Sequence, residues 1–242
     1  TYCGAIPVFA DIEEETWCLS VESVEKNISE KTKAIMVVDL FGNMPDMDSL
    51  LEISEKYSIP LIEDAAEALG SKYKEVRAGK FGVGGAHSFH RTKTMTTGEG
   101  GALLLDDDKL YERAKFLRDH GRSFTNSYQI LEATPKYMPS NLQGAMACAQ
   151  FQRIDELVER KRHFLHMYKK HLSAVEDLQL NIENDYIYNG VWATSLVVGK
   201  SHKMTKQDFI NRLDEISIPQ RPFFHPLSSM PAYEKYNTGS EE

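Results

Sequence analysis

The stretch "AIMVVDLFGNMPDMDSLLEISEKYSIPLIED", residues 34–64, decides the fold class. It holds two short apolar runs, at 34–41 and 59–63, of the length typical of strands. Between them, residues 47–57 repeat apolar side chains at helical spacing, and Asp46 is placed to cap the start of that helix. A strand, a helix and a second strand in this order predict a crossover unit of a parallel sheet.

Further apolar runs extend the same pattern along the chain. They lie at residues 7–12, 84–89 and 102–105 and alternate with polar segments of helical period. Continuous apolar runs are typical of strands that are covered on both faces. The sequence therefore predicts an α/β protein with a mostly parallel central sheet flanked by helices.

Three regions are predicted from the order of these patterns. Residues 1–140 form a large α/β domain, and residues 141–175 form one long connecting helix, because their apolar side chains keep steps of three and four. A strand-like run at 191–198 and a helix at 206–216 follow. They predict part of a small α+β domain over residues 176–242.

Composition narrows the class of protein. The chain has 242 residues, a formal net charge of -8 and interspersed charges, which argues against nucleic acid as the main partner. Its 3 cysteines are widely separated, so we expect neither a disulfide framework nor a thiolate zinc site. No apolar run is long enough to span a membrane, and no signal peptide is evident at Thr1. We expect a cytoplasmic protein that binds no membrane.

Reactive side chains follow two of the predicted strands. Asp64 ends the run at 59–63, Ser88 ends the run that begins at 84, and Lys93 comes shortly after it. Ligands of parallel sheets bind at the carboxyl ends of the strands, so these residues are the first candidates for a site. A lysine nucleophile, a carboxylate for a ring nitrogen and a hydroxyl for a phosphate are what pyridoxal phosphate requires of a protein.

Simpler readings of the same residues stay open at this point. Lys93 follows the pattern of a solvated lysine beside a glycine turn, and Asp64 is equally suited to cap a helix. The histidines lack matched carboxylates at ligand spacing, so we expect no metal site.

Several motifs resemble one enzyme family over nearly the whole chain. The chain is similar to the DegT/DnrJ/StrS sugar-nucleotide aminotransferases, which belong to fold-type I of the pyridoxal phosphate enzymes. The matching stretches, in chain order, are "GAIPVFADI", "TKAIMVVDLFGNMPDMD", "LIEDAAEALGS", "SFHRTKTMTTGEGG", "LRDHGR", "SNLQGAMACAQFQRIDELVERKR" and "RPFFHPLSSMPAY".

The resemblance implies a role for each candidate residue. Lys93 is the catalytic lysine that forms the internal aldimine and later carries the proton between the substrate carbon and the cofactor. Asp64 pairs with the pyridinium nitrogen, Glu67 contacts the ring hydroxyl, and Ser88 binds the phosphate. A branch of the family that works as dehydratases has histidine at the position of Lys93, so lysine here favours transamination.

The last motif implies a substrate class. "RPFFHPLSSMPAY" resembles the perosamine synthase branch, which aminates a GDP-linked 4-keto-6-deoxy sugar with glutamate as the amino donor. We expect His90, Arg221 and His225 to contact the nucleotide-linked ketosugar. The resemblance also implies a homodimer and a place in cell-surface or secondary-metabolite sugar biosynthesis.

The matching stretches begin after the start of the family's sequence pattern and end before its finish. The family has a phosphate-binding helix start before the point that corresponds to Thr1, and it continues beyond "MPAYEKYN". We therefore expect a chain truncated at both ends. A non-catalytic chain of this fold with a binding or interaction role is the alternative hypothesis.

Overall fold

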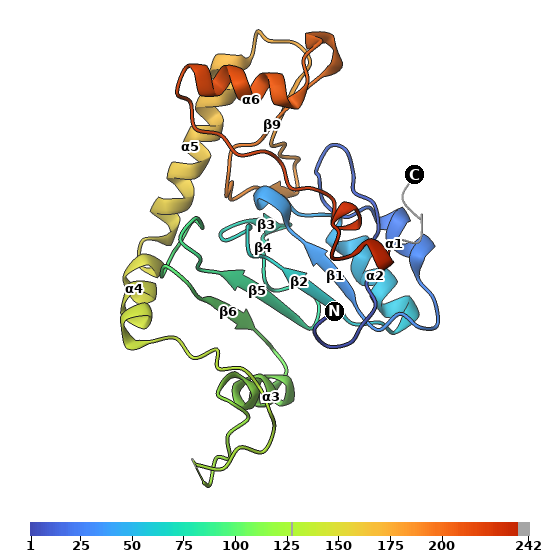
Figure 1. Ribbon diagram of the computed structural model, residues 1–242, viewed down its shortest axis with the longest axis vertical. Helices are drawn as coiled ribbons and strands as arrows, with labels where there is room; N and C mark the ends of the chain where they lie inside the picture. The colour runs from blue at the N-terminus through green and yellow to red at the C-terminus, as the bar shows by residue number, and fades with distance from the viewer. Residues whose placement is uncertain (127, 237–242) are drawn as a thin grey trace.

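A mostly parallel sheet of four strands organises the molecule. A computed structural model describes residues 1–126 and 128–236, and its main sheet has the order β1-β2-β5-β6 (Figure 1). The strands are β1 (Ile35–Val38), β2 (Leu61–Asp64), β5 (Gly84–Ser88) and β6 (Gly101–Leu104). The first three are mutually parallel, and β6 is antiparallel to β5. The predicted α/β class with a mostly parallel sheet is confirmed.

The quoted stretch forms the crossover unit that was predicted. Helix α2 (Met47–Tyr57) joins β1 to β2, and the Asp46 side chain accepts a hydrogen bond from the backbone N–H of Ser49 at 3.2 Å. The helix ends at Ser58, which has a left-handed backbone conformation. Capping satisfies a backbone donor that the first turn of a helix otherwise leaves without a partner.

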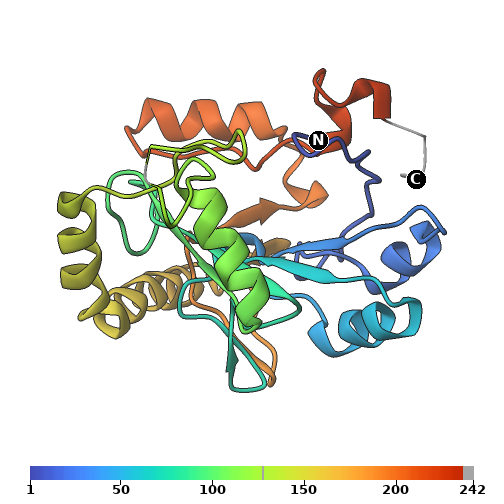
Figure 2. The same ribbon diagram turned by 90° about the horizontal axis from the view of Figure 1, so that it is seen from below.

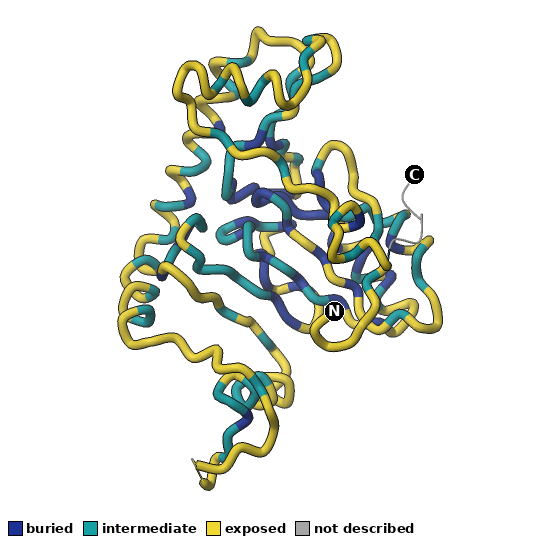
Figure 3. Tube along the Cα trace, in the orientation of Figure 1, coloured by how far each residue is buried: buried dark blue, intermediate teal, exposed yellow. Residues whose placement is uncertain are grey.

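Two helices cover one face of this sheet. Helix α1 (Val21–Asn27) and α2 pack on the face that carries Val37 and Leu61, and both helices lie at the same end of the molecule in Figures 1 and 2. Strand β1 alternates buried and exposed side chains, so Met36 on the opposite face is 63% exposed. The core therefore lies on the side of the sheet that α1 and α2 cover. Figure 3 shows buried segments in the region of β1, β2 and α2.

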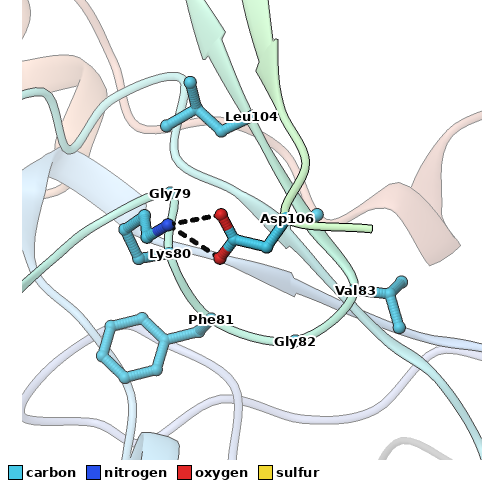
Figure 4. Close-up of a pocket in the computed structure, with 8 residues that line it drawn as sticks. Gly79, Lys80, Phe81, Gly82, Val83, Leu104 and Asp106 are labelled. Carbon is cyan, nitrogen blue, oxygen red and sulfur yellow. Dashed lines mark hydrogen bonds and ion pairs between the residues drawn. The ribbon is translucent and has the colours of Figure 1, made fainter. Parts of the chain in front are cut away.

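A glycine-rich turn leads into the strand that ends at Ser88. Residues 79–83 approach β5 so closely that a Cβ on Gly85 would lie 2.4 Å from the Cα of Gly79. The Lys80 ammonium bonds both carboxylate oxygens of Asp106 at 2.7 Å, which ties this turn to the end of β6 (Figure 4). The stretch "GKFGVGG", residues 79–85, is thus a turn that passes into strand β5 at Gly84.

The long helix expected over residues 141–175 is two helices in the structure. They are α4 (Asn141–Phe151) and α5 (Ile154–Leu172), and Arg153 between them leaves helical geometry with φ -115° and ψ 16°. The Arg153 guanidinium bonds Glu156 in the first turn of α5 at 2.8 and 2.9 Å. The helical spacing of apolar residues continues across the break, which is why the sequence pattern did not reveal it.

The remaining elements are short. They comprise α3 (Asp108–Arg118) after the main sheet, a three-stranded sheet of order β4-β3-β8, a two-stranded sheet of β7 and β9, and α6 near the end. Their bounds are β3 (Lys72–Tyr73), β4 (Val76–Arg77), β7 (Leu178–Leu180), β8 (Ile187–Tyr188), β9 (Leu196–Val198) and α6 (Lys206–Glu215). Single 3-10 turns are η1 (Leu40–Gly42), η2 (Lys200–His202), η3 (Leu227–Ser229) and η4 (Glu234–Tyr236).

Two predicted strands are wrong or too long. Residues 7–12 form no strand and contribute only an isolated bridge between Ile12 and Leu19, because apolar character alone supplies no ladder partner. The run at 191–198 is a strand only from Leu196, since Val191 has a φ of 53° and its backbone N–H is bound by the Asn189 side chain. The end of the predicted second domain, residues 237–242, lies outside the described residues. The division into domains stays a prediction.

Candidate active site

The carboxyl edge of the main sheet brings the predicted cofactor residues together. Asp64 is the last residue of β2 and Ser88 is the last residue of β5, and these two strands are hydrogen-bonded neighbours with Asp64 opposite Ala86. The two side chains therefore lie at the same edge, where parallel sheets bind their ligands.

Lys93 lies beyond the end of β5 and is held by a carboxylate. Its Nζ is 3.1 Å from Glu67 Oε1, and the two side chains are only 13% and 10% exposed. The second oxygen of Glu67 accepts the backbone N–H of Phe41 at 3.1 Å. Lys93 is thus a largely buried lysine with a defined partner rather than a solvated surface lysine.

An indole ring covers the same amine. Lys93 Nζ lies 4.3 Å from the centroid of the Trp192 ring. The Trp192 N–H donates to the backbone oxygen of Thr92 at 2.8 Å, and its ring is parallel to that of Phe41, with centroids 5.9 Å apart and planes 3° apart. A segment far along the chain therefore completes the surroundings of Lys93.

Backbone hydrogen bonds fix the loop that carries Lys93. The backbone N–H of Phe89 donates to Gly100 at 2.8 Å, and that of Thr97 donates back to Phe89 at 2.9 Å. Gly100 has a φ of 143°, in the region that favours glycine. Helix α4 adds a side-chain contact, because Gln150 Oε1 accepts the backbone N–H of Thr96 at 3.2 Å.

Asp64 and Ser88 keep bonding capacity toward the site. Asp64 Oδ1 accepts the backbone N–H of Ala66 at 3.1 Å, but no helix follows it, so the helix-cap reading of Asp64 is wrong. Ser88 Oγ accepts the backbone N–H of His90 at 3.3 Å and keeps its own proton to donate.

The three residues predicted to contact substrate have different surroundings. His90 lies at the site, with Nδ1 3.0 Å from Thr92 Oγ1 and Nε2 3.6 Å from Glu99. Arg221 and His225 have exposed side chains. Phe223, between them, packs on the Phe41 ring at a centroid distance of 4.9 Å, so this segment reaches the aromatic side of the site.

Two further features of this edge were missed in the sequence. Asp39 follows β1 directly, just as Asp64 ends β2, so an acidic residue closing an apolar run was an available signal. Burial and the neighbouring carboxylate of Glu63 raise the pKa of Asp39 well above its usual value. Trp192 gave no local signal, because its contacts with Lys93 and Thr92 depend on tertiary packing.

The residue types fit pyridoxal phosphate by the chemistry of their donors. The site offers a largely buried amine at Lys93, a carboxylate at Asp64 and a hydroxyl at Ser88 on adjoining elements of one edge. Within residues 1–126 and 128–236, the structure has no group of three or more His, Cys, Asp or Glu side chains placed to hold a metal ion.

The similarity of this chain to known proteins decides its family. The profile of the DegT/DnrJ/EryC1/StrS aminotransferase family matches residues 1–242. The chain belongs to this family. It is 36% identical over 236 residues to GDP-perosamine synthase of Escherichia coli O157:H7, covering 97% of this chain and 64% of that protein. It is 33% identical over 232 residues to GDP-perosamine synthase of Vibrio cholerae, covering 96% and 63%.

Another similar protein carries a different name. L-glutamine:2-deoxy-scyllo-inosose aminotransferase of Micromonospora echinospora is 39% identical over 169 residues, which are 66% of this chain and 40% of that protein. The present chain spans somewhat less than two thirds of the length of the perosamine synthases that it matches, at 64% and 63%.

Two solved structures share the fold of this chain. The aminotransferase TlmJ of Streptoalloteichus hindustanus has a TM-score of 0.88 at 25% identity, covering 95% of this chain and 62% of that chain. 3-amino-5-hydroxybenzoic acid synthase also gives 0.88, at 26% identity, covering 97% and 62%. The predicted fold of the pyridoxal phosphate aminotransferases is confirmed.

Among the described residues, no helix is long and apolar enough to cross a membrane.

Proposed function

We propose that this chain is the major part of a pyridoxal phosphate-dependent aminotransferase acting on a nucleotide-linked sugar. In this proposal the amino acceptor is a GDP-linked 4-keto-6-deoxy sugar and the donor is glutamate. The observation that carries it is the largely buried Lys93 amine, 3.1 Å from Glu67 at the edge where Asp64 and Ser88 end their strands.

Each residue has a defined task in this proposal. Bound pyridoxal phosphate supplies an electron sink for the carbanion formed at the substrate carbon. Lys93 provides the amine that holds the cofactor and then moves the proton at the substrate carbon. Asp64 pairs its carboxylate with the ring nitrogen, Ser88 donates to the phosphate, and Glu67 orients Lys93 and the ring hydroxyl.

The substrate assignment rests on the relatives. Two perosamine synthases match nearly the whole chain at 36% and 33% identity, which supports a sugar-nucleotide acceptor. We propose that His90, Arg221 and His225 contact that acceptor and that the protein works as a cytoplasmic homodimer. The non-catalytic alternative is not favoured, because Lys93 and its partners form one connected site.

Covalent trapping tests the first half of this proposal. We expect pyridoxal phosphate followed by borohydride to modify Lys93 stoichiometrically, as read by peptide mass spectrometry. Lys93→Met should abolish the modification. Lys80→Met is the matched control, because Lys80 lies at the opposite end of β5 and pairs with Asp106. Equal modification of the wild-type chain and Lys93→Met would sink the assignment.

Amino transfer tests the second half. We expect 2-oxoglutarate to form from glutamate beyond one equivalent per bound cofactor only when a GDP-linked 4-keto-6-deoxy sugar is present to accept the amino group. L-glutamine is the comparison donor, since one relative is named for it. Turnover with glutamine and none with glutamate would make glutamine the amino donor in place of glutamate. Attachment of pyridoxal phosphate to Lys93 without amino transfer to any ketosugar nucleotide would refute the proposed substrate.

A further inference from the structure

Trp192 reaches the site from the part of the chain that follows the long helices. It lies in the connection between β8 and β9, and its indole contacts three residues of the site. The ring face lies 4.3 Å from Lys93 Nζ, the N–H bonds the oxygen of Thr92 at 2.8 Å, and the ring is parallel to Phe41.

These contacts form a continuous ring of interactions that begins and ends at the Lys93 amine. Lys93 Nζ bonds Glu67, Glu67 bonds the backbone N–H of Phe41, the Phe41 ring is parallel to Trp192, and Trp192 faces Lys93. The ammonium therefore has a carboxylate oxygen and the π face of an indole as neighbours. A tryptophan face attracts a cation, and the attraction is stronger where water is excluded.

The position of Trp192 is fixed by its backbone. Lys161 on α5 donates to the backbone oxygen of Trp192 at 3.0 Å. Gly42, beside Phe41, approaches so closely that a Cβ there would lie 2.6 Å from the backbone nitrogen of Val191. The segment that carries Trp192 thus packs backbone against backbone on the turn after β1, and the hydrogen bond of the Trp192 N–H to Thr92 holds the ring beside Lys93.

We propose that Trp192 is a positioning residue for Lys93 and that its indole face holds the ε-ammonium while this group is not covalently engaged. The proposal rests on the proposed function, in which Lys93 has a free ε-amino group during part of each cycle. The indole face keeps the Lys93 amine beside Glu67 in that interval. The hydrogen bond from the Trp192 N–H to Thr92 fixes the indole ring relative to the loop that carries Lys93.

A double-mutant cycle on the 242-residue chain without cofactor measures the contact itself. The variants are Lys93→Met, Trp192→Met and the pair, and the readout is the equilibrium constant of unfolding in urea. Methionine keeps apolar bulk at both positions but offers neither a cation nor a π face. We expect the two changes to be coupled by roughly 2- to 30-fold in that constant, the range of a cation–π contact.

Trp17 provides the matched control for the cycle. It belongs to the same aromatic cluster, with its ring centroid 6.0 Å from that of Phe41, and it is buried at 6% exposure. Coupling between Trp17→Met and Lys93→Met should stay near one-fold. A coupling near one-fold for Trp192 as well would overturn the proposal.

The rate at which pyridoxal phosphate attaches to Lys93 tests the positioning role of Trp192. We expect borohydride-trapped attachment of pyridoxal phosphate at Lys93 to slow about tenfold or more in Trp192→Met, because misplaced reacting groups lose rate steeply. Trp192→Phe, which keeps a ring face, should restore most of the rate. Attachment by Trp192→Met at the rate of Trp17→Met would overturn the role.

Failure of the proposed function gives a different result. If the wild-type chain attaches no pyridoxal phosphate at all, the aminotransferase proposal falls, while the cycle without cofactor still decides whether Trp192 holds Lys93.

Discussion

Replacing Asp39 by asparagine should make the stability of the protein much less dependent on pH. Asp39 is 0% exposed, and neither of its carboxyl oxygens has a hydrogen-bond partner among the described residues. Glu63, also 0% exposed, has one oxygen bonded by the backbone N–H of Phe81 and the other without a partner. Burial, then the charge of Glu63, then a hydrogen bond that protonated Asp39 forms with the Glu63 carboxyl, and last the charge of Asp64, raise the pKa of Asp39.

The sign and size of the effect follow from this raised pKa. An aspartate in the unfolded chain loses its proton near pH 3.9, whereas folded Asp39 keeps it to higher pH. The folded state then binds more protons, so the free energy of unfolding falls as pH rises, by about 1.4 kcal/mol per pH unit. The fall continues with rising pH until the folded carboxyl itself loses its proton.

Urea denaturation of Asp39→Asn and the wild-type chain between pH 4 and pH 7.5 measures this effect. Asparagine cannot titrate, and its amide supplies a donor for the unpartnered oxygen of Glu63. We expect the free energy of unfolding of Asp39→Asn minus that of wild type to grow as pH rises from 4, by about 1.4 kcal/mol per pH unit while folded Asp39 keeps its proton. Using the difference cancels the titration of carboxylates that do not interact with Asp39, so the change that remains belongs to Asp39 together with Glu63 and Asp64.

The exposed Asp185 supplies the control for this experiment. Asp185→Asn should leave the difference from wild type small across the whole range. A difference for Asp39→Asn that stays flat with pH, or that shrinks toward neutral pH, would refute a protonated Asp39.

Two further predictions concern packing beneath the site. Gly85→Ala should lower the free energy of unfolding by about 1–3 kcal/mol, because its Cβ would lie 2.4 Å from the backbone of Gly79, which has little room to move. A variant that is as stable as wild type in urea denaturation would contradict this close approach. Leu50→Ala should cost about 2–5 kcal/mol, since Leu50 is 0% exposed in the core, whereas Leu142→Ala at a 79% exposed position should cost little by the same measurement.

The crossover unit was predictable because its signals are local. Helix α2 has an apolar stripe, a capping Asp46 and a stop at Ser58, and all of these lie within the quoted stretch. Helix α1 was missed, since it spans only seven residues, Val21–Asn27, and has no side-chain cap. Short helices depend on packing more than on propensity, so their sequences carry little signal.

The site was predictable only in part, for a similar reason. Asp64 and Ser88 end neighbouring strands, so the topology alone places them at one edge. The structure pairs Lys93 with Glu67, two residues that the family motifs had already singled out. Their roles stay predictions. Trp192 and Phe41 were not predictable, because aromatic residues in apolar surroundings are more often core than site, and only tertiary packing brings them together.

The antiparallel strand β6 has a consequence for the energy of ligand binding. It pairs Ser88 with Gly101, so the chain between them, residues 89–100, is closed at its base by the backbone ladder. The entropy lost on closing and ordering this loop is therefore incurred when the strands pair during folding. A ligand that meets Lys93 finds a loop already ordered, and more of its contact energy remains available as affinity.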